Sequence, residues 1–223
     1  MQAAVLRRAR RLLVPLVSVA ALALTAPGAL AACAGQDVAP GDPGAAAATL
    51  CLLNAQRAAH GLGALSASGT LDRAAGDFAR DMVARGFFDH VSPGGGTMMD
   101  RIKAAGWVPA GSWSAGENIA WGSGSLATPA SIVDGWMHSA GHRANILSAA
   151  YGQVGIGIAA GAPQAGVRGA GTYVSDFTSA AGGGTGAAAR RPVARCAGRA
   201  SARARVALID HKAAARRCTP ARR

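Results

Sequence analysis

The chain has 223 residues, which is room for one ordinary domain with extensions on either side. Its formal net charge of +12 is unevenly distributed: residues 1–32 hold four arginines and no acid, residues 180–223 hold eleven basic residues and one acid, and residues 33–179 hold eight basic and ten acidic residues. A nucleic-acid groove needs positive charge on the folded domain itself, so the near-neutral central segment excludes specific nucleic-acid binding.

The first 32 residues have the pattern of a secretory signal peptide. A cationic start is followed by an apolar run from Leu12 to Leu24, and Ala29-Leu30-Ala31 is a small-residue cleavage site. The apolar run is too short for a comfortable membrane span. The sequence therefore predicts a secreted, extracellular protein. A rival interpretation is that Leu30-Ala31-Ala32-Cys33 is a lipobox, which would give a lipoprotein anchored through Cys33.

Export changes the interpretation of the four cysteines, because thiols oxidise outside the cytoplasm. Two disulfides are expected, with three possible pairings. We expect the sequential pairing, in which Cys33 bonds to Cys51 and Cys196 bonds to Cys218. Lipidation of Cys33 would leave Cys51 unpaired, which argues against the anchored alternative.

Helix signals dominate the first half of the central segment. Asp42-Pro43 has the chemistry of a helix start, and the helix is expected to end at Gly61. A second helix is predicted from Thr70 to Arg85, where apolar residues recur at spacings of three and four. Thr97 and Asp100 form a capping box that starts a short helix.

Strand signals come later in the chain. A short strand is expected around Glu117 to Trp121, followed by a helix from Thr128 to His138 and a turn from His142 to Leu147. The β-rich segments Val154 to Ile158 and Thr172 to Phe177 predict an antiparallel hairpin.

The order of these elements, helices first and strands late, predicts an α+β domain over residues 45–180, preceded by a Pro/Gly/Ala/Asp linker at 33–44. Residues 181–223 begin as a Gly/Ala linker and continue as an Arg-rich basic tail. This tail has too few large apolar residues to fold alone, so we expect it to be disordered or loosely ordered.

Three residues stand out as candidates for chemistry: His90, Glu117 and His142. Histidine and glutamate bind divalent metals and move protons near neutral pH. Two histidines and a carboxylate are able to hold zinc, to act as general acid and base, or to form the polar floor of a ligand pocket. The sequence has no H-E-x-x-H and no G-x-S-x-G motif to decide among these uses.

Five segments in order resemble the CAP superfamily of cysteine-rich secretory, antigen 5 and pathogenesis-related-1 proteins, also called the SCP domain. The match is closest to short bacterial secreted members, and the segments that carry it are Leu53–Ala58, Met82–His90, Gly116–Ala120, Trp136–Leu147 and Tyr173–Phe177. The resemblance implies a three-layer α-β-α sandwich with His90, Glu117 and His142 in one cleft. It also implies a divalent cation there, such as zinc.

One position departs from the family pattern. Ser139 stands where many eukaryotic members carry a second glutamate, so the His-Glu-Glu-His set is incomplete. Asp134 is a candidate for the missing carboxylate, and Asn145 is expected to bond to backbone near the cleft.

The resemblance favours a non-enzymatic binding module at the bacterial cell envelope. Its cleft would take a divalent cation and a small or lipid-like ligand, and its basic tail would contact an anionic cell-wall polymer or membrane surface. Two alternatives stay open. One is a metal-dependent hydrolase or protease that uses His90, Glu117 and His142 as catalytic residues. The other is a structural envelope protein held by its tail.

Overall fold

The computed structural model describes residues 33–109, 111–179 and 206–208, and within them the helices and strands follow a simple order. The elements are α1 (Ala45–Ala59), β1 (Ser66–Ala67), α2 (Gly69–Arg85), α3 (Met98–Ala104), β2 (Ala115–Ser123), the 3₁₀ helix η1 (Gly124–Ala127), α4 (Pro129–His138), α5 (Ala140–Ile146), β3 (Gln153–Ala160), β4 (Ala170–Thr178) and β5 (Val206–Leu208). The predicted signal peptide, Cys196, Cys218 and the tail apart from β5 lie outside the described residues.

The strands form one mixed sheet in the order β1-β3-β4-β2-β5. The predicted hairpin is confirmed, because β3 and β4 pair antiparallel along their length. β4 also pairs antiparallel with all of β2, and the short strand β1 adds to β3 in parallel. β5 pairs with only part of β2, from Ala120 to Gly122. The predicted α+β fold class is therefore observed.

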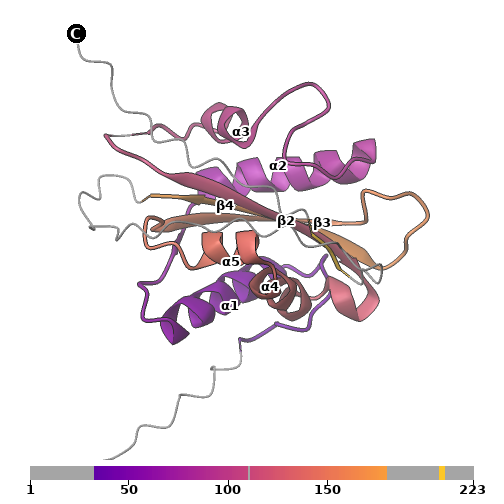
Figure 1. The fold of residues 1–223 in the computed structure, drawn as a ribbon. Helices are drawn as coiled ribbons and strands as arrows, with labels where there is room; N and C mark the ends of the chain where they lie inside the picture. The colour runs from indigo at the N-terminus through magenta and orange to yellow at the C-terminus, as the bar shows by residue number, and fades with distance from the viewer. Residues whose placement is uncertain (1–32, 110, 180–205, 209–223) are drawn as a thin grey trace, which may run out of the picture.

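Helices cover both faces of the sheet, which gives the expected three layers (Figure 1). α2 and α3 lie on one face, and α1, α4 and α5 lie on the other. Buried clusters lie on both faces of the sheet. Phe78, Met82 and Val174 belong to one of the two clusters under α2 and α3, and Leu53 and Trp136 belong to the larger cluster on the opposite face. None of the described helices is long and apolar enough to cross a membrane.

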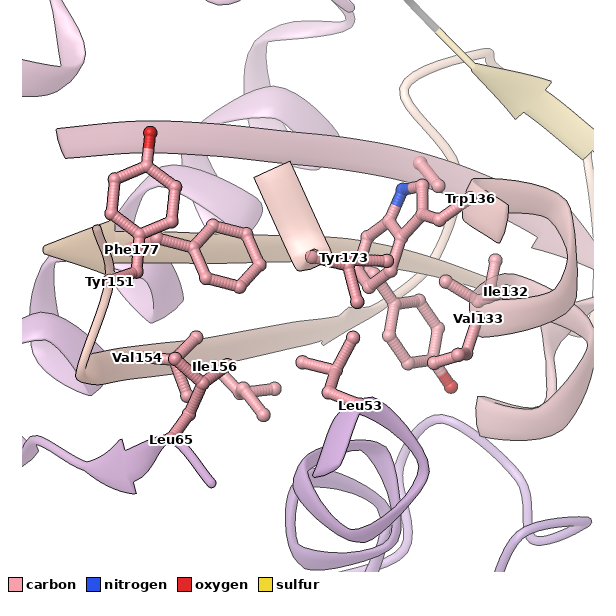
Figure 2. Close-up of a cluster of buried hydrophobic side chains, with 12 residues drawn as sticks. Leu53, Leu65, Ile132, Val133, Trp136, Tyr151, Val154, Ile156, Tyr173 and Phe177 are labelled. Carbon is pink, nitrogen blue, oxygen red and sulfur yellow. The ribbon is translucent and has the colours of Figure 1, made fainter. Parts of the chain in front are cut away.

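Large aromatic side chains fill the core between the sheet and the α1/α4/α5 layer (Figure 2). The rings of Tyr151 and Phe177 stack with centroids 5.6 Å apart. The polar ends of the other two rings are satisfied, because Trp136 donates to the carbonyl of Ile119 and Tyr173 donates to that of Ala127. Burial of Trp136 and Tyr173 therefore leaves their polar atoms hydrogen-bonded.

α2 packs unusually close to β3, because β3 carries glycine at two positions that face the helix. A Cβ atom at Gly155 would overlap the backbone of Leu71, and one at Gly157 would overlap the backbone of Ala75. The helix then ends where Gly86 adopts the left-handed conformation at φ 67°, as the sequence predicts. These contacts fix the height of α2 above the sheet and hence the start of the loop that carries His90.

Arg57 is a buried cation in the last turn of α1 that joins the loop after α1 to the end of α5 and the loop that follows it. Its guanidinium donates to the carbonyl oxygens of Gly63 (2.7 Å), Ile146 (2.8 Å), Ser148 (2.9 Å) and Tyr151 (3.2 Å). The residue is only 2% exposed, and burial lowers the pKa of its guanidinium from the ordinary value. Arg57 thereby ties α1 to the segment that follows α5.

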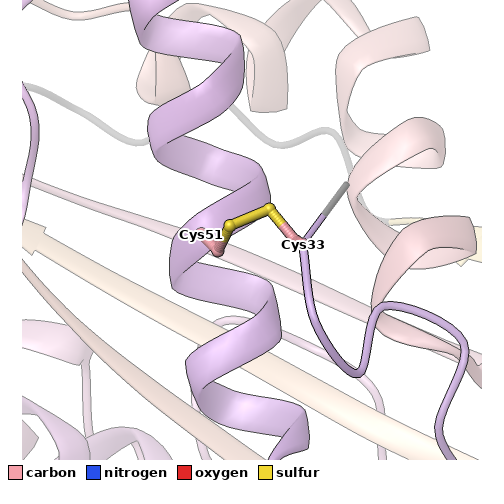
Figure 3. The surroundings of a disulfide bond; sticks show 2 residues. All are labelled: Cys33 and Cys51. Atoms are coloured by element: carbon pink, nitrogen blue, oxygen red, sulfur yellow. A yellow bond between two sulfur atoms is a disulfide. The ribbon is translucent and has the colours of Figure 1, made fainter. Parts of the chain in front are cut away.

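The predicted Cys33–Cys51 disulfide is present and joins the first described residue to α1 (Figure 3). Closing a loop of this length stabilises a fold by about 3 kcal/mol in the chain-entropy account. The bond uses the Cys33 sulfur, which the lipoprotein alternative would need for its thioether. The segment predicted as a linker at 33–44 is therefore anchored, and Pro40 also packs against Gly171 of β4.

Candidate functional site

Glu117, the only glutamate in the chain, lies on β2 directly opposite Asp176 of β4. Both residues are buried, at 3% and 0% exposure. The next paired positions along the same face, Ile119 and Val174, pack in the cluster that includes Phe78 of α2. Because side chains alternate between the faces of a strand, Glu117 and Asp176 point to the α2 layer. Two carboxyl groups are thus placed side by side in the interior.

His90 reaches Glu117 from the loop after α2. Its Nδ1 lies 2.7 Å from Oε1 of Glu117, and a carboxylate accepts this bond, so Nδ1 carries the hydrogen. The preceding aromatic Phe87 packs against Phe78 with ring centroids 5.9 Å apart, which holds the loop to the helix. The structure therefore brings together two of the three predicted site residues.

Arg101, which the sequence analysis missed, completes this cluster from α3. One terminal nitrogen lies 2.6 Å from Oε2 of Glu117, and the other donates to the carbonyls of His90 and Gly96, both at 3.1 Å. Its guanidinium carbon lies 3.3 Å from the centre of the Phe78 ring, in cation–π geometry. Arg101 lies in the last turn of α3, where a cation is favourable to the helix dipole, so its place in the helix gives no sign of a specific partner.

The local structure of α3 sets the position of Arg101. Thr97 accepts a hydrogen bond from the backbone N–H of Asp100, and the Asp100 carboxylate accepts one from the backbone N–H of Thr97. This predicted capping box is confirmed. It also lowers the pKa of Asp100, chiefly through the bonds from Thr97. Arg101 follows directly, so the cap fixes the helix turn from which its side chain extends.

Asp176 is the second residue that the sequence analysis did not assign to the site. Neither oxygen of its carboxyl meets hydrogen-bond geometry with another group among the described residues. Burial raises the pKa of Asp176 well above its ordinary value of 3.8, the charge of Glu117 raises it further, and the Arg101 cation opposes the rise.

The raised pKa of Asp176 predicts a pH-dependent loss of stability. A carboxyl whose folded pKa lies above its unfolded pKa contributes stability that is fully present below the unfolded pKa and is lost as pH rises through the folded pKa. Asp176→Asn, which keeps the shape and stays neutral, should therefore match the wild type near pH 3.5 and be more stable at pH 7. Melting temperatures of both proteins from pH 3.5 to 8 test this, and a difference that is constant across that range would contradict it.

His142 comes from α5, in the layer on the other face of the sheet. It is 2% exposed, and its Nδ1 lies 2.8 Å from Oγ of Ser139. These two residues occupy the N-cap and N3 positions of α5, so the contact is local in the chain. The amide of Asn118, next to Glu117 on β2, donates to the carbonyl of His142 at 3.1 Å. The backbone of α5 is thereby held against the strand that carries Glu117.

Asn145 adds a second tie between α5 and the same strand. Its amide donates to the backbone carbonyl of Glu117 at 3.1 Å and to Oδ1 of Asn118 at 2.8 Å. These bonds satisfy polar groups of β2 at positions that β5 does not cover, since β5 pairs with β2 only from Ala120 to Gly122. Asn145 therefore positions Glu117 through its backbone.

Asp134, the candidate for the missing carboxylate, is not placed near Glu117. Its side chain is 74% exposed on α4 and lies 3.4 Å from Nδ1 of His138. Arg143, another charged residue of this region, bonds to His60 at 2.8 Å. The carboxyl that faces Glu117 is instead that of Asp176.

The arrangement of these side chains does not fit a zinc ion. A catalytic zinc takes three protein ligands and a structural zinc takes four. Within residues 33–109, 111–179 and 206–208, no group of three or more His, Cys, Asp or Glu side chains is placed to hold a metal. Both oxygens of Glu117 already face N–H groups, from His90 and Arg101. The metal role of His90, Glu117 and His142 stays a prediction.

A pocket of about 390 Å³ opens between α2 and α3, and Arg101 forms one of its walls. Half of its lining is apolar and half is charged or polar: Ala74, Phe78, Ala104 and Ala105, with Asp77, Asp81, Ser92 and Arg101. Its volume lies in the range of small-ligand sites. Because Glu117 is buried, a molecule in this pocket would meet Arg101 before it met the carboxylate.

Comparison with known proteins identifies a family and several relatives that this chain resembles. Residues 50–176 match the family model described as CAP, the cysteine-rich secretory protein family. Two Bacillus subtilis proteins are similar to this chain. The uncharacterised protein YkwD is 40% identical over 106 residues, which is 48% of this chain and 39% of YkwD. The uncharacterised membrane protein YlbC is 34% identical over 107 residues, which is 48% of this chain and 29% of YlbC. The chain thus spans about two fifths or less of the length of these relatives.

Solved structures of similar shape come from other bacteria. One is an extracellular protein containing an SCP domain from Bacillus anthracis, with 28% identity, a TM-score of 0.49, and coverage of 60% of this chain and 40% of that one. Another is a cysteine-rich secretory protein from Staphylococcus aureus, with 16% identity, a TM-score of 0.47, and coverage of 62% and 39%. The family model matches more than half of the residues, from the middle of α1 to Asp176 of β4. This chain belongs to the CAP family of cysteine-rich secretory proteins.

Proposed function

We propose that this protein is exported and acts outside the cell, at the bacterial envelope, as a non-enzymatic binding module. The signal-like first 32 residues support export, and the Cys33–Cys51 disulfide suits an oxidising compartment. Membership of the family of cysteine-rich secretory proteins agrees with this location. The mature chain would start just before the cysteine that the disulfide fixes to α1.

The pocket between α2 and α3 is the observation that carries the binding role. Its apolar wall, formed by Ala74, Ala104 and Ala105, suits a hydrocarbon chain or ring. Arg101 in its lining suits an anionic head group, because a guanidinium forms charge-assisted hydrogen bonds with carboxylates and phosphates. We therefore propose that the small or lipid-like ligand is an apolar molecule with one acidic group, and that it docks in this pocket.

The proposal is tested with a dansyl-labelled fatty acid as the probe. Titration into the wild type should give saturable fluorescence enhancement. Ala104→Trp fills the pocket from an exposed position at the end of α3 and should weaken binding by at least about tenfold. Ala58→Trp adds the same side chain at an exposed position of α1, outside the pocket, and should bind like the wild type. Equal loss in both variants, or no saturable binding by the wild type, would overturn the pocket as the ligand site.

The basic tail is proposed to hold the protein near anionic wall polymers. Residues 180–223 carry eleven basic residues against one acid, whereas the domain is near neutral. Such an attraction is screened by salt, with a Debye length of about 10 Å at 0.1 M. Retention on purified cell walls should therefore fall as salt is raised, and replacement of the tail arginines by glutamine should have the same effect at low salt.

The hydrolase alternative gains less support from the geometry. In that alternative Glu117 or His90 would have to reach a substrate bond. Glu117 is 3% exposed and its two oxygens are engaged by His90 and Arg101, so a substrate would first have to displace one of these bonds. This arrangement favours binding over turnover.

A further inference from the structure

The cluster around Glu117 contains a permanent positive charge, which is the guanidinium of Arg101. The carboxylate of Glu117 presents two oxygens, of which Oε1 lies 2.7 Å from Nδ1 of His90 and Oε2 lies 2.6 Å from a guanidinium nitrogen of Arg101. A divalent metal bound by Glu117 would have to replace at least one of these two bonds. The bond to Arg101 is the shorter of the two and the one that brings a permanent charge.

Arg101 is held in place from several directions. Its second terminal nitrogen donates to two backbone carbonyls, those of His90 and Gly96, and its flat face lies on the ring of Phe78. The side chain is 13% exposed. Because a guanidinium is planar and its donors form a rigid fork, this set of partners leaves little freedom for it to swing away from Glu117. The cation is therefore part of the folded site.

The charge count of the site also favours Arg101 over a metal. Two carboxyl groups, Glu117 and Asp176, lie side by side in the interior, and Arg101 is the cation whose charge acts on both of them. A guanidinium compensates these carboxyls through its bond to Glu117 and through its charge near Asp176, without the three or four closely placed ligands that zinc requires. A dication at the same position would also be repelled by the Arg101 charge, so binding of the dication would be less favourable.

We propose that Arg101 occupies the cation position of the His90/Glu117 site and closes the site to divalent metals. The site then works as a carboxylate–guanidinium pair, and the role that the family resemblance suggests for zinc is taken by a side chain of α3. This inference does not depend on which ligand, if any, enters the pocket next to Arg101.

Zinc alone is the probe that tests it, by calorimetric titration of the untagged, oxidised protein. The wild type should show no zinc binding that depends on His90, so the wild type and His90→Ala should give the same titration curve. Arg101→Met removes the charge at similar length and should bind zinc at least about tenfold more tightly than the wild type. The double variant Arg101→Met/His90→Ala should lose that gain. Arg101→Lys keeps a cation next to Glu117 and should stay as unresponsive to zinc as the wild type.

A matched control separates the site from a general effect of charge. Arg80→Met removes an arginine from an exposed pair with Asp77, and zinc binding should not change. Micromolar zinc binding by the wild type that His90→Ala abolishes would overturn the proposal. So would a folded Arg101→Met variant, checked by circular dichroism, that binds zinc no better than the wild type. If Arg101→Met does not fold, the comparison of wild type with His90→Ala still decides whether the native site takes the metal.

Discussion

Replacement of Arg57 by methionine should lower the free energy of unfolding by about 3–5 kcal/mol. Four backbone carbonyls, two of them on the chain that follows α5, would lose their donor at once. Each buried, unsatisfied carbonyl costs about 1 kcal/mol or more, and this sum exceeds the relief from no longer burying the charge. Denaturant unfolding measures the change, and the melting temperature should fall by about 10 °C.

Two further variants make this expectation specific. Arg57→Lys keeps the charge but not the fork of donors, so it should lose an intermediate amount of stability. Arg85→Met removes an arginine whose side chain is 47% exposed in a surface pair with Asp81, and it should change stability by no more than about 0.5 kcal/mol. A melting temperature for Arg57→Met close to that of Arg85→Met would show that the four carbonyls find other partners.

Gly157→Ala should destabilise the domain by about 3 kcal/mol or more, although it adds a single methyl group. The new Cβ would overlap the carbonyl carbon and oxygen of Ala75 and the amide nitrogen of Gly76, all of them backbone atoms of α2. No side-chain rotation relieves such an overlap, so the helix must move away from β3. Phe78 and Met82 would then leave the buried cluster that the helix forms with the sheet.

The control for this variant is another glycine-to-alanine change in open space. A Cβ at Gly63 meets nothing within 4 Å, and Gly63→Ala should be neutral or slightly stabilising. The same denaturation assay serves both proteins. Equal stability of Gly157→Ala and Gly63→Ala would mean that the α2–β3 contact is looser than the structure has it.

Local sequence signals predict most helix ends correctly. Where a predicted end differs from the structure, a nearby residue explains the difference. The stop of α2 at Gly86 and the start of α4 at Thr128-Pro129 are confirmed. α1 begins later than Asp42-Pro43 predicts, because Oδ1 of Asp42 accepts a bond from the amide of Gly44 and closes a turn first. The break between α4 and α5 lies at Ser139, whose backbone is extended, and the turn predicted after it is the helix α5.

The composition of the site was harder to predict, because it depends on sheet register. The sequence identifies Glu117 and His90 through motifs, and the structure joins them. Asp176 lies within a predicted strand, but only the pairing of β4 with β2 places it opposite Glu117. Arg101 reaches the same point from a separate helix. Contacts between residues far apart in the chain leave no periodic pattern, so a single sequence gives no signal for them.

The strand β5 has a practical consequence for work with shortened forms of this protein. It covers the backbone of β2 from Ala120 to Gly122, which would otherwise be part of an open sheet edge. Exposed strand edges are templates for pairing between molecules, and they are a common cause of self-association. A version that stops at Ser179 would expose this edge, so we expect it to be less soluble than the full chain. The C-terminal extension would in this respect act as a safeguard against aggregation, separately from any role of its charge.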